Sequence, residues 1–179
     1  MYLLQLFAYI LMIINHFFYV TSNYHTDLLS FIGLLSYIIF TSYIAYGFTK
    51  SSNRTLYFQR LLVFALISEV PWLYLFYNDG YSFLNILFSY ACIIYYSINI
   101  SSNRLFDRII ALLVLLCSFI FCEYSFFTYF IFCIFVSVFN HISIFTKNRN
   151  VPIKFRYLKY MLYPFHLYLL ALIKCVFLR

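Results

Sequence analysis

Five polar side chains stand in or at the ends of long apolar stretches of this sequence: His16, Glu69, Asn85, Glu123 and His166. Ionisable groups are costly inside a membrane helix, and where they occur they usually mark a function. An imidazole can act as a general base, and a desolvated carboxyl can serve as an acid or orient a histidine. Taken singly, each histidine is more often a hydrogen-bond partner between helices, and Glu69 is equally well explained as a structural carboxyl. The set of five shifts the interpretation toward a site.

Composition indicates the class of protein that must position these groups. The chain has 179 residues, of which 65% are hydrophobic, 25% aromatic and only 9% charged. This composition predicts an all-α, polytopic transmembrane helix bundle. Because no linker is long enough to separate two units, we expect a single integral-membrane domain over residues 1–179. The net charge of +7 does not indicate nucleic-acid binding, since the Lys and Arg residues stand in short turns between apolar segments.

Apolar runs separated by polar or breaker-containing turns predict the spanning segments. A spanning helix needs about 20 mostly apolar residues. The predicted segments are residues 2–20, 28–48, 61–77 and 83–100, two segments within 109–145, and residues 160–177. The run 109–145 is too long for one helix, so we divide it at residues 122–125, around Glu123. Seven spans result, and six remain possible if part of this run only re-enters the membrane.

The positive charges predict the orientation of the bundle. The turns after the second, fourth and sixth segments hold 10 of the 12 Lys and Arg residues, and the turns after the first, third and fifth hold none. Cytoplasmic turns carry the excess of Lys and Arg, so we expect the N-terminus inside. This orientation places the five polar groups between the middle and the outer side of the membrane.

Several other chemistries have no support in the sequence. It contains no Walker loop, no Rossmann glycine pattern, no GxSxG and no HExxH, and we predict no metal site. The five cysteines form no CxxC pair, and we expect buried free thiols rather than metal ligands or catalytic thiols. We interpret the many aromatic residues as lipid-facing and interfacial packing.

Short motifs follow one another in a fixed order along most of the chain. They are residues 12–16 (MIINH), 57–61 (YFQRL), 65–71 (ALISEVP), 84–88 (LNILF), 123–124 (EY) and 163–167 (YPFHL). In this order they resemble the TraX family of bacterial membrane proteins, named for a conjugal-transfer protein that acetylates the N-terminus of F-type pilin. The chain departs from the family pattern at three charged positions, with Asn15 in place of Asp, Leu34 in place of Arg and Tyr46 in place of Glu.

The resemblance implies an acyltransferase of the bacterial cytoplasmic (inner) membrane, with acetyl-CoA as the donor. The acceptor would be an amine or hydroxyl of a pilin, peptide or envelope molecule, and the surrounding partner is membrane lipid. His16 would be the base, with Asn15 positioning it. The other residues that the resemblance implies are Glu69, Glu123 and His166 in catalysis, Asn85 in substrate binding, and Lys50, Arg54 and Arg60 at the phosphates of acetyl-CoA. Topology alone also explains the three basic residues.

Two other functions fit the same sequence. A non-enzymatic membrane partner, related to the family but without its activity, would bind and assist a secreted peptide or pilus component. The three lost charges favour this alternative, and acetyl transfer by the purified protein would exclude it. A small transporter is the third possibility, although the chain lacks the glycine-broken helices that many transporters use.

Overall fold

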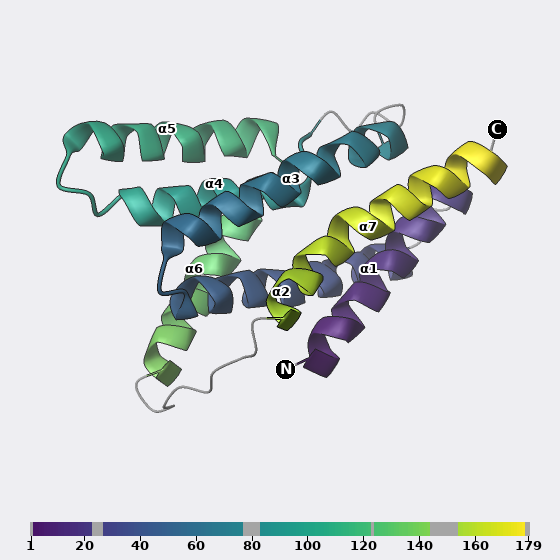
Figure 1. Cartoon of the computed structure of the whole chain (residues 1–179), viewed down its shortest axis with the longest axis horizontal. Coiled ribbons are helices and arrows are strands. Elements are labelled where there is room, and N and C mark those ends of the chain that lie inside the picture. The colour runs from purple at the N-terminus through teal and green to yellow at the C-terminus, as the bar shows by residue number, and fades with distance from the viewer. Residues whose placement is uncertain (1, 23–26, 77–82, 123, 144–153, 178–179) are drawn as a thin grey trace.

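A computed structural model describes residues 2–22, 27–76, 83–122, 124–143 and 154–177. Within this part, the chain forms seven α-helices (Figure 1), which confirms the predicted all-α fold. They are α1 (Tyr2–Ser22), α2 (Asp27–Lys50), α3 (Arg54–Phe76), α4 (Ile86–Asn99), α5 (Leu105–Phe121), α6 (Ser125–Ser143) and α7 (Lys154–Phe177). Helices α1, α2 and α3 are long and apolar enough to cross a membrane, and α4, α6 and α7 contain shorter apolar stretches.

Three predicted helix starts are wrong, all at basic turns. Helix α3 begins at Arg54 rather than near residue 61, α5 at Leu105 rather than 109, and α7 at Lys154 rather than 160. Lys and Arg favour helix, so basic residues extend a helix beyond its apolar part instead of ending it. At α3 the start is fixed by Asn53, whose Oδ1 accepts a hydrogen bond from the backbone N–H of Leu56 at 2.9 Å.

The division of the run 109–145 is confirmed. Helix α5 ends at Phe121 and α6 begins at Ser125. The backbone N–H of Leu84 donates to the carbonyl of Phe121 at 2.8 Å, which holds the α5–α6 turn against the start of α4. Tyr124 has a φ of 51°, in the left-handed region that residues other than glycine seldom adopt. Glu123 lies outside the described residues.

The helices pack in a connected set around α2, α3 and α4. Helix α1 packs against α2, α2 against α6, and α3 against both α4 and α7. Figure 1 shows α3 and α7 crossing the molecule in the same oblique direction, with α5 at the edge against α4. Helix α4 is short but central, because Ile93 and Ile94 are fully buried. The buried apolar core therefore comes mostly from α3 and α4, with α7 packed against α3 and α1 packed against α2 and α7.

Helix α7 supplies a hydrogen bond to a backbone carbonyl that a proline leaves without its helical partner in α3. Pro71 lies inside α3 and has no N–H, so the carbonyl of Ile67 lacks its helical partner. The hydroxyl of Tyr168 donates to that carbonyl at 3.3 Å. Further along, Nζ of Lys174 donates to the carbonyl of Leu75 at 2.7 Å. A cation is stabilised by the dipole of α3 at the C-terminal end of that helix. This interaction accounts for a lysine at the end of the bundle opposite to the other described basic residues.

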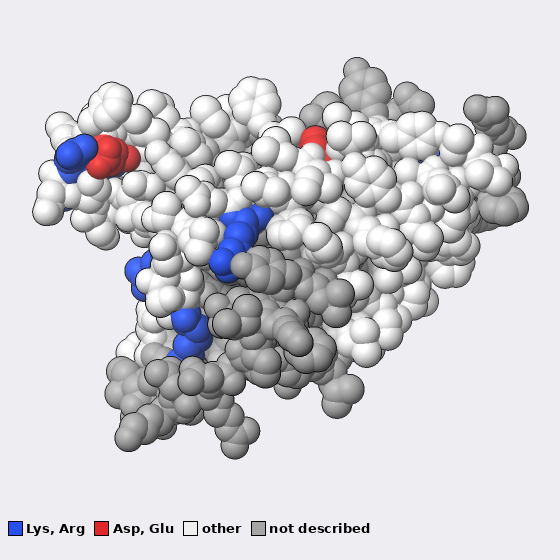
Figure 2. Space-filling view, in the orientation of Figure 1, with Lys and Arg blue, Asp and Glu red and all other residues white. Residues whose placement is uncertain are grey.

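Much of the surface formed by the described residues is apolar. Leucine, isoleucine, valine and phenylalanine side chains on the outward faces are highly exposed, as at Val70, Ile120 and Phe130. The connections α2–α3 and α4–α5 lie on the left of Figure 1, and most of the visible Lys and Arg atoms in Figure 2 gather on that side. This separation is typical of a protein surrounded by lipid.

The predicted burial of the cysteines is wrong for three of the five. Cys122 is buried and Cys92 partly buried, but Cys117, Cys133 and Cys175 are exposed on the outward faces of their helices. A thiol is apolar enough to face lipid, so an apolar sequence context does not separate the core of a bundle from its outer face.

Candidate active site

Two of the predicted site histidines meet between α1 and α7. Nδ1 of His16 lies 3.0 Å from Nε2 of His166, and the ring planes are inclined by only 12°. Nδ1 of His166 lies 3.2 Å from the carbonyl oxygen of Leu162, one turn earlier in α7. Trp72 and Phe76 of α3 pack around the His16 ring, with centroid distances of 6.0 and 5.6 Å.

This chain of contacts determines where the protons of two neutral rings lie. A carbonyl oxygen only accepts, so Nδ1 of His166 carries the proton that is donated to Leu162. Nε2 of His166 is then an acceptor, and Nδ1 of His16 must donate to it. Nε2 of His16 keeps its lone pair and has no hydrogen-bond partner among the described residues. The arrangement therefore prepares one nitrogen, Nε2 of His16, to take a proton.

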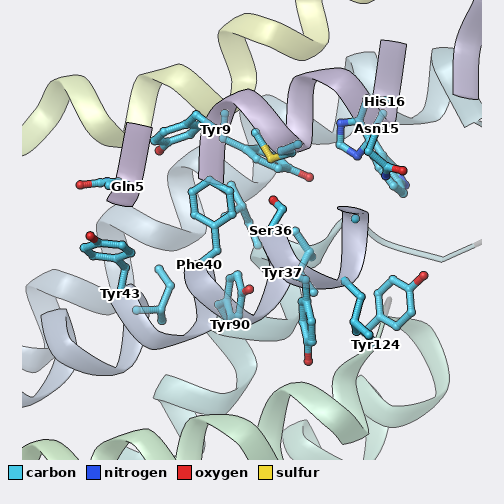
Figure 3. A pocket seen from close by; sticks show the side chains of 18 of the residues that line it. Gln5, Tyr9, Asn15, His16, Ser36, Tyr37, Phe40, Tyr43, Tyr90 and Tyr124 are labelled. Atoms are coloured by element: carbon cyan, nitrogen blue, oxygen red, sulfur yellow. The ribbon is translucent and has the colours of Figure 1, made fainter. Parts of the chain in front are cut away.

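His16 lies in the wall of a cavity of about 420 Å³ that runs between α1, α2, α3 and α4. Cavities of this size hold small ligands in many proteins. In the close-up of Figure 3, Gln5 and Tyr43 lie toward one end, and Asn15, His16 and Tyr124 lie toward the other. His166 is not in the wall and lies behind His16. No Lys, Arg, Asp or Glu is among the described residues that line the cavity.

Tyrosines make up a large part of the cavity wall, and our interpretation of the aromatic residues as lipid-facing and interfacial is wrong for those that are buried there, namely Tyr9, Tyr57, Tyr90 and Tyr163. The tyrosines in the wall are Tyr9, Tyr19, Tyr37, Tyr43, Tyr57, Tyr90, Tyr124 and Tyr163. A signal for part of this wall was present in the sequence: residues 5, 9, 12, 16 and 19 recur at spacings of three and four, which places them on one face of α1. The polar residues on that face are Gln5, Tyr9, His16 and Tyr19.

Hydroxyl groups in and near the wall are ordered by hydrogen bonds. Thr41 Oγ1 donates to the carbonyl of Tyr37 at 2.9 Å, so in the 3.0 Å contact between Thr41 and Tyr90 it is the Tyr90 hydroxyl that donates. The Tyr37 hydroxyl donates to Thr128 of α6 at 3.0 Å. Ser36 donates to the carbonyl of Ala8 at 3.1 Å and links α2 to α1. The described residues of the wall therefore supply fixed polar groups, and His16 is the one among them that can acquire a positive charge.

Asn15 lies against Gly33 at the His16 end of the cavity. A Cβ placed on Gly33 would stand 2.9 Å from Nδ2 and 3.1 Å from Cγ of Asn15, so a side chain at residue 33 would require the Asn15 amide to move. Leu34, the next residue, also lines the cavity. Two of the three departures from the family pattern thus occur together at this wall. The third, Tyr46, packs against Phe139 of α6 at a centroid distance of 5.4 Å.

Glu69 and Asn85 form a separate pair that is not in the cavity wall. Oε2 of Glu69 accepts from the backbone N–H of Asn85 at 3.1 Å and from its Nδ2 at 2.6 Å. Asn85 also donates to the carbonyl of Ala65, and its Oδ1 caps α4 by accepting from Leu87. Oε1 of Glu69 is buried with no hydrogen-bond partner in the described part of the chain. The pair fastens α3 to the start of α4, where a helix dipole favours a carboxylate.

The basic residues that we expected at the phosphates of acetyl-CoA lie away from His16. Lys50 ends α2 and Arg54 begins α3, and both are exposed. The guanidinium carbon of Arg54 lies 4.7 Å from the centroid of the Phe48 ring. Arg60 lies on α3 six residues after Arg54 and does not line the cavity. Tyr57, which lies between these two arginines in the sequence, does line the cavity. The end of the cavity that contains Tyr57 is therefore the end nearer to Lys50 and Arg54.

The sequence was also compared with known proteins. The family described as TraX protein matches residues 1–144. The chain belongs to the TraX family. The match includes His16, Asn15, Glu69 and Asn85, and it ends before α7, so the His166 side of the histidine pair lies outside it. Comparisons with curated proteins and with solved structures found no match. TraX-family membership and the apolar helices together identify a membrane protein.

Proposed function

We propose that this TraX-family chain is an integral-membrane acyltransferase. It moves an acetyl group from acetyl-CoA to an amine or hydroxyl of a pilin, peptide or envelope molecule. One observation carries the proposal: Nε2 of His16 retains a lone pair, its ring is held by His166, and the ring lines a cavity large enough for a ligand.

The reaction follows from that geometry. The acceptor nitrogen or oxygen attacks the thioester carbonyl carbon while Nε2 of His16 takes the acceptor proton. The carbon–sulfur bond then breaks, and the departing thiolate receives the proton from His16. The products are the acetylated acceptor and free CoA, and His16 returns to its neutral form. A positioned base of this kind contributes about 10²–10⁴-fold to a rate.

The neighbouring residues take different parts in this proposal. His166 is a positioning residue, because it fixes the tautomer and the angle of the His16 ring without reaching the cavity. The amide of Asn15 lines the cavity beside His16 and can donate to the oxyanion that forms on the attacked carbonyl. Glu69 and Asn85 act at a distance, by fixing the α3–α4 junction.

A second function, a non-enzymatic membrane partner, is favoured by one observation. No carboxylate is found among the described residues of the cavity wall, and Asn15 and Leu34 are neutral there. A neutral, tyrosine-lined cavity also suits the binding of an uncharged peptide segment.

We also propose that the protein lies in the bacterial cytoplasmic (inner) membrane with its N-terminus inside. The exposed basic residues Lys50, Arg54, Arg104 and Arg108 at the α2–α3 and α4–α5 connections support this orientation. A reporter inserted at Asn53 should be active only in its cytoplasmic form. A reporter at Asp79, in the connection after α3, should be active only in its external form. The reverse result at both positions would overturn the orientation.

Acetyl transfer in native membranes separates the two functions. Membranes from host cells that produce the chain, and membranes from cells that lack it, are incubated with acetyl-CoA radiolabelled in the acetyl group. Label in a protein, peptide or lipid fraction that depends on the chain supports the transferase. A pilus or peptide component that copurifies with the chain, with no chain-dependent label in any fraction, supports the binding partner instead.

A further inference from the structure

We infer that the cavity is a passage across the bundle, in which a phosphorylated thioester docks at the α2–α3 end and its uncharged arm extends to His16. The acceptor then approaches His16 from the opposite end. This inference rests on the proposed function, and it adds the side from which each substrate enters.

The length of the cavity is the first support. Its wall includes Gln5 and Tyr19 of α1, which are 14 residues apart, and a helix rises 1.5 Å per residue, so the cavity follows α1 for roughly 21 Å. Leu29 and Ile44 of α2 give a similar span. The hydrocarbon core of a bilayer is about 30 Å thick, so the cavity extends over a large part of it. Figure 3 shows the lining side chains spread along this length.

The two ends of the cavity are assigned by contacts between helices. At one end, Tyr43 near the end of α2 is hydrogen-bonded to the backbone of Gln5 near the start of α1. Tyr57 of α3 lines the same end, and its hydroxyl donates to the carbonyl of Ile44 at 3.2 Å. This end therefore lies next to the α2–α3 connection, which carries Lys50 and Arg54. His16 and Asn15 lie toward the other end.

The distribution of charge decides which part of a donor can enter. Phosphate groups would lose their hydration in the cavity, and the described wall offers no Lys or Arg to compensate. Lys50 and Arg54, exposed near the α2–α3 end of the cavity, can bind phosphates while these stay in water. The pantetheine arm of a CoA thioester is linear and uncharged, and its amides can bond to polar wall groups such as Gln5 and Ser36. Only the arm fits the chemistry of the interior.

At the opposite end, part of the cavity wall is also exposed on the outer surface of the described part of the chain. Leu34 is 51% exposed and Tyr124 is 56% exposed, although both line the cavity, and Ser30 is exposed as well. These side chains belong to both the wall and the outer surface, so we assign the entry of the acceptor to the region between α2 and the start of α6. An acceptor entering there meets Asn15 and His16 without crossing the bundle.

Two buried serines provide a matched test of the passage. Ser36 and Ser68 are 2% and 0% exposed, and each donates to a backbone carbonyl, but only Ser36 lines the cavity. Ser36→Cys and Ser68→Cys are made in a full-length chain whose five native cysteines are replaced by serine. Both variants are labelled with N-ethylmaleimide in inside-out and right-side-out membrane vesicles. Ser36→Cys should react at least 10-fold faster than Ser68→Cys.

Protection by acetyl-CoA then reports the path of the arm. Acetyl-CoA on the side of Lys50 should slow the labelling of Ser36→Cys at least 5-fold, and acetyl-CoA on the other side should not. Adenosine 3′,5′-bisphosphate, which lacks the arm, should not protect from either side. Adding Arg54→Gln should raise the acetyl-CoA concentration needed for half protection several-fold. Protection from the opposite side only, from neither side, or by the armless nucleotide would overturn the passage.

The same vesicles keep this inference separate from the proposed function. Acetyl transfer that continues without one-sided protection would leave the transferase intact and overturn the passage. One-sided protection without any acetyl transfer would overturn the transferase and retain a site that binds the donor.

Discussion

Nδ1 of His16 and Nε2 of His166 lie 3.0 Å apart, and this contact joins the first and last helices of the chain. The bond from His166 to the Leu162 carbonyl orients the pair, so that the ring nitrogen without a partner among the described residues belongs to His16, which lines the cavity. Catalysis in the proposed reaction therefore depends on α7, although Tyr163 is the only α7 residue among the described residues of the cavity wall.

Replacing His166 should separate positioning from chemistry. His166→Ala leaves Nδ1 of His16 without its acceptor, and we expect acetyl transfer to fall roughly 10- to 100-fold, part of what a positioned base supplies. His166→Gln should recover much of this loss, because its amide oxygen can accept from His16. The initial rate of acetyl transfer at equal protein level is the measurement. His141→Ala, on the exposed end of α6, is the control and should leave the rate unchanged. Equal rates in His166→Ala and the parent chain would contradict the positioning role.

The effect of Gly33→Ala on the free energy of unfolding should change sign when Asn15 is also replaced, in a double-mutant cycle. In the parent chain, Gly33→Ala forces Asn15 to move and should destabilise the protein by about 1–3 kcal/mol. In an Asn15→Ala background the space is open, and Gly33→Ala should stabilise by up to about 1 kcal/mol because alanine favours helix. Unfolding in detergent, followed by intrinsic fluorescence, measures both. The same effect of Gly33→Ala in the two backgrounds would show that the contact does not constrain the helices.

Glu69 should behave as a structural residue. Glu69→Gln keeps an acceptor for Asn85 and should insert and fold with a loss of about 1–3 kcal/mol, from the buried amide group that replaces Oε1. Glu69→Lys places a cation near the N-terminal end of α4 and removes the acceptor, so it should accumulate poorly in the membrane. Membrane level and acetyl transfer are measured together. The folded Glu69→Gln variant should retain acetyl transfer. A Glu69→Gln variant that folds but has lost acetyl transfer would show that Glu69 takes part in the reaction.

The link between α7 and the proline of α3 can be tested without reference to activity. Tyr168→Phe removes the donor to the Ile67 carbonyl and should cost about 0.5–1.5 kcal/mol of stability. In a Pro71→Ala background residue 71 regains its N–H and can bond to Ile67, so Tyr168→Phe should then be nearly neutral. Thermal unfolding of the four proteins of this cycle in one detergent measures the difference. An equal cost in both backgrounds would show that the tyrosine does not compensate for the proline.

The fold could be predicted from the sequence because hydropathy decides it. Apolar runs gave the helices, and the length of the run 109–145 required the division that the structure shows between Phe121 and Ser125. The starts of α3, α5 and α7 were missed because basic residues indicate the membrane edge, whereas the helix continues beyond that edge. Only the cap at Asn53 indicated where α3 begins.

The candidate site could be predicted only in part. Depth along each helix placed His16, His166, Glu69 and Asn85 at similar levels, but depth gives no information on which way a side chain points. The structure divides them into two pairs, one at the cavity and one at the α3–α4 junction. The tyrosine wall was missed because composition cannot distinguish an aromatic side chain that faces lipid from one that faces a cavity. The spacing of residues 5, 9, 12, 16 and 19 did contain that information.

Acetyl transfer by His16→Gln tests the central claim most directly. Glutamine keeps a hydrogen bond to His166 and much of the size of the ring, but it cannot take a proton. Host-cell membranes with equal amounts of the parent chain or the variant are incubated with acetyl-CoA radiolabelled in the acetyl group, and label in acceptor molecules is followed with time. We predict that His16→Gln reduces the rate by about 10²–10⁴-fold, the contribution of a general base. A rate in His16→Gln close to that of the parent chain would show that His16 is not the base.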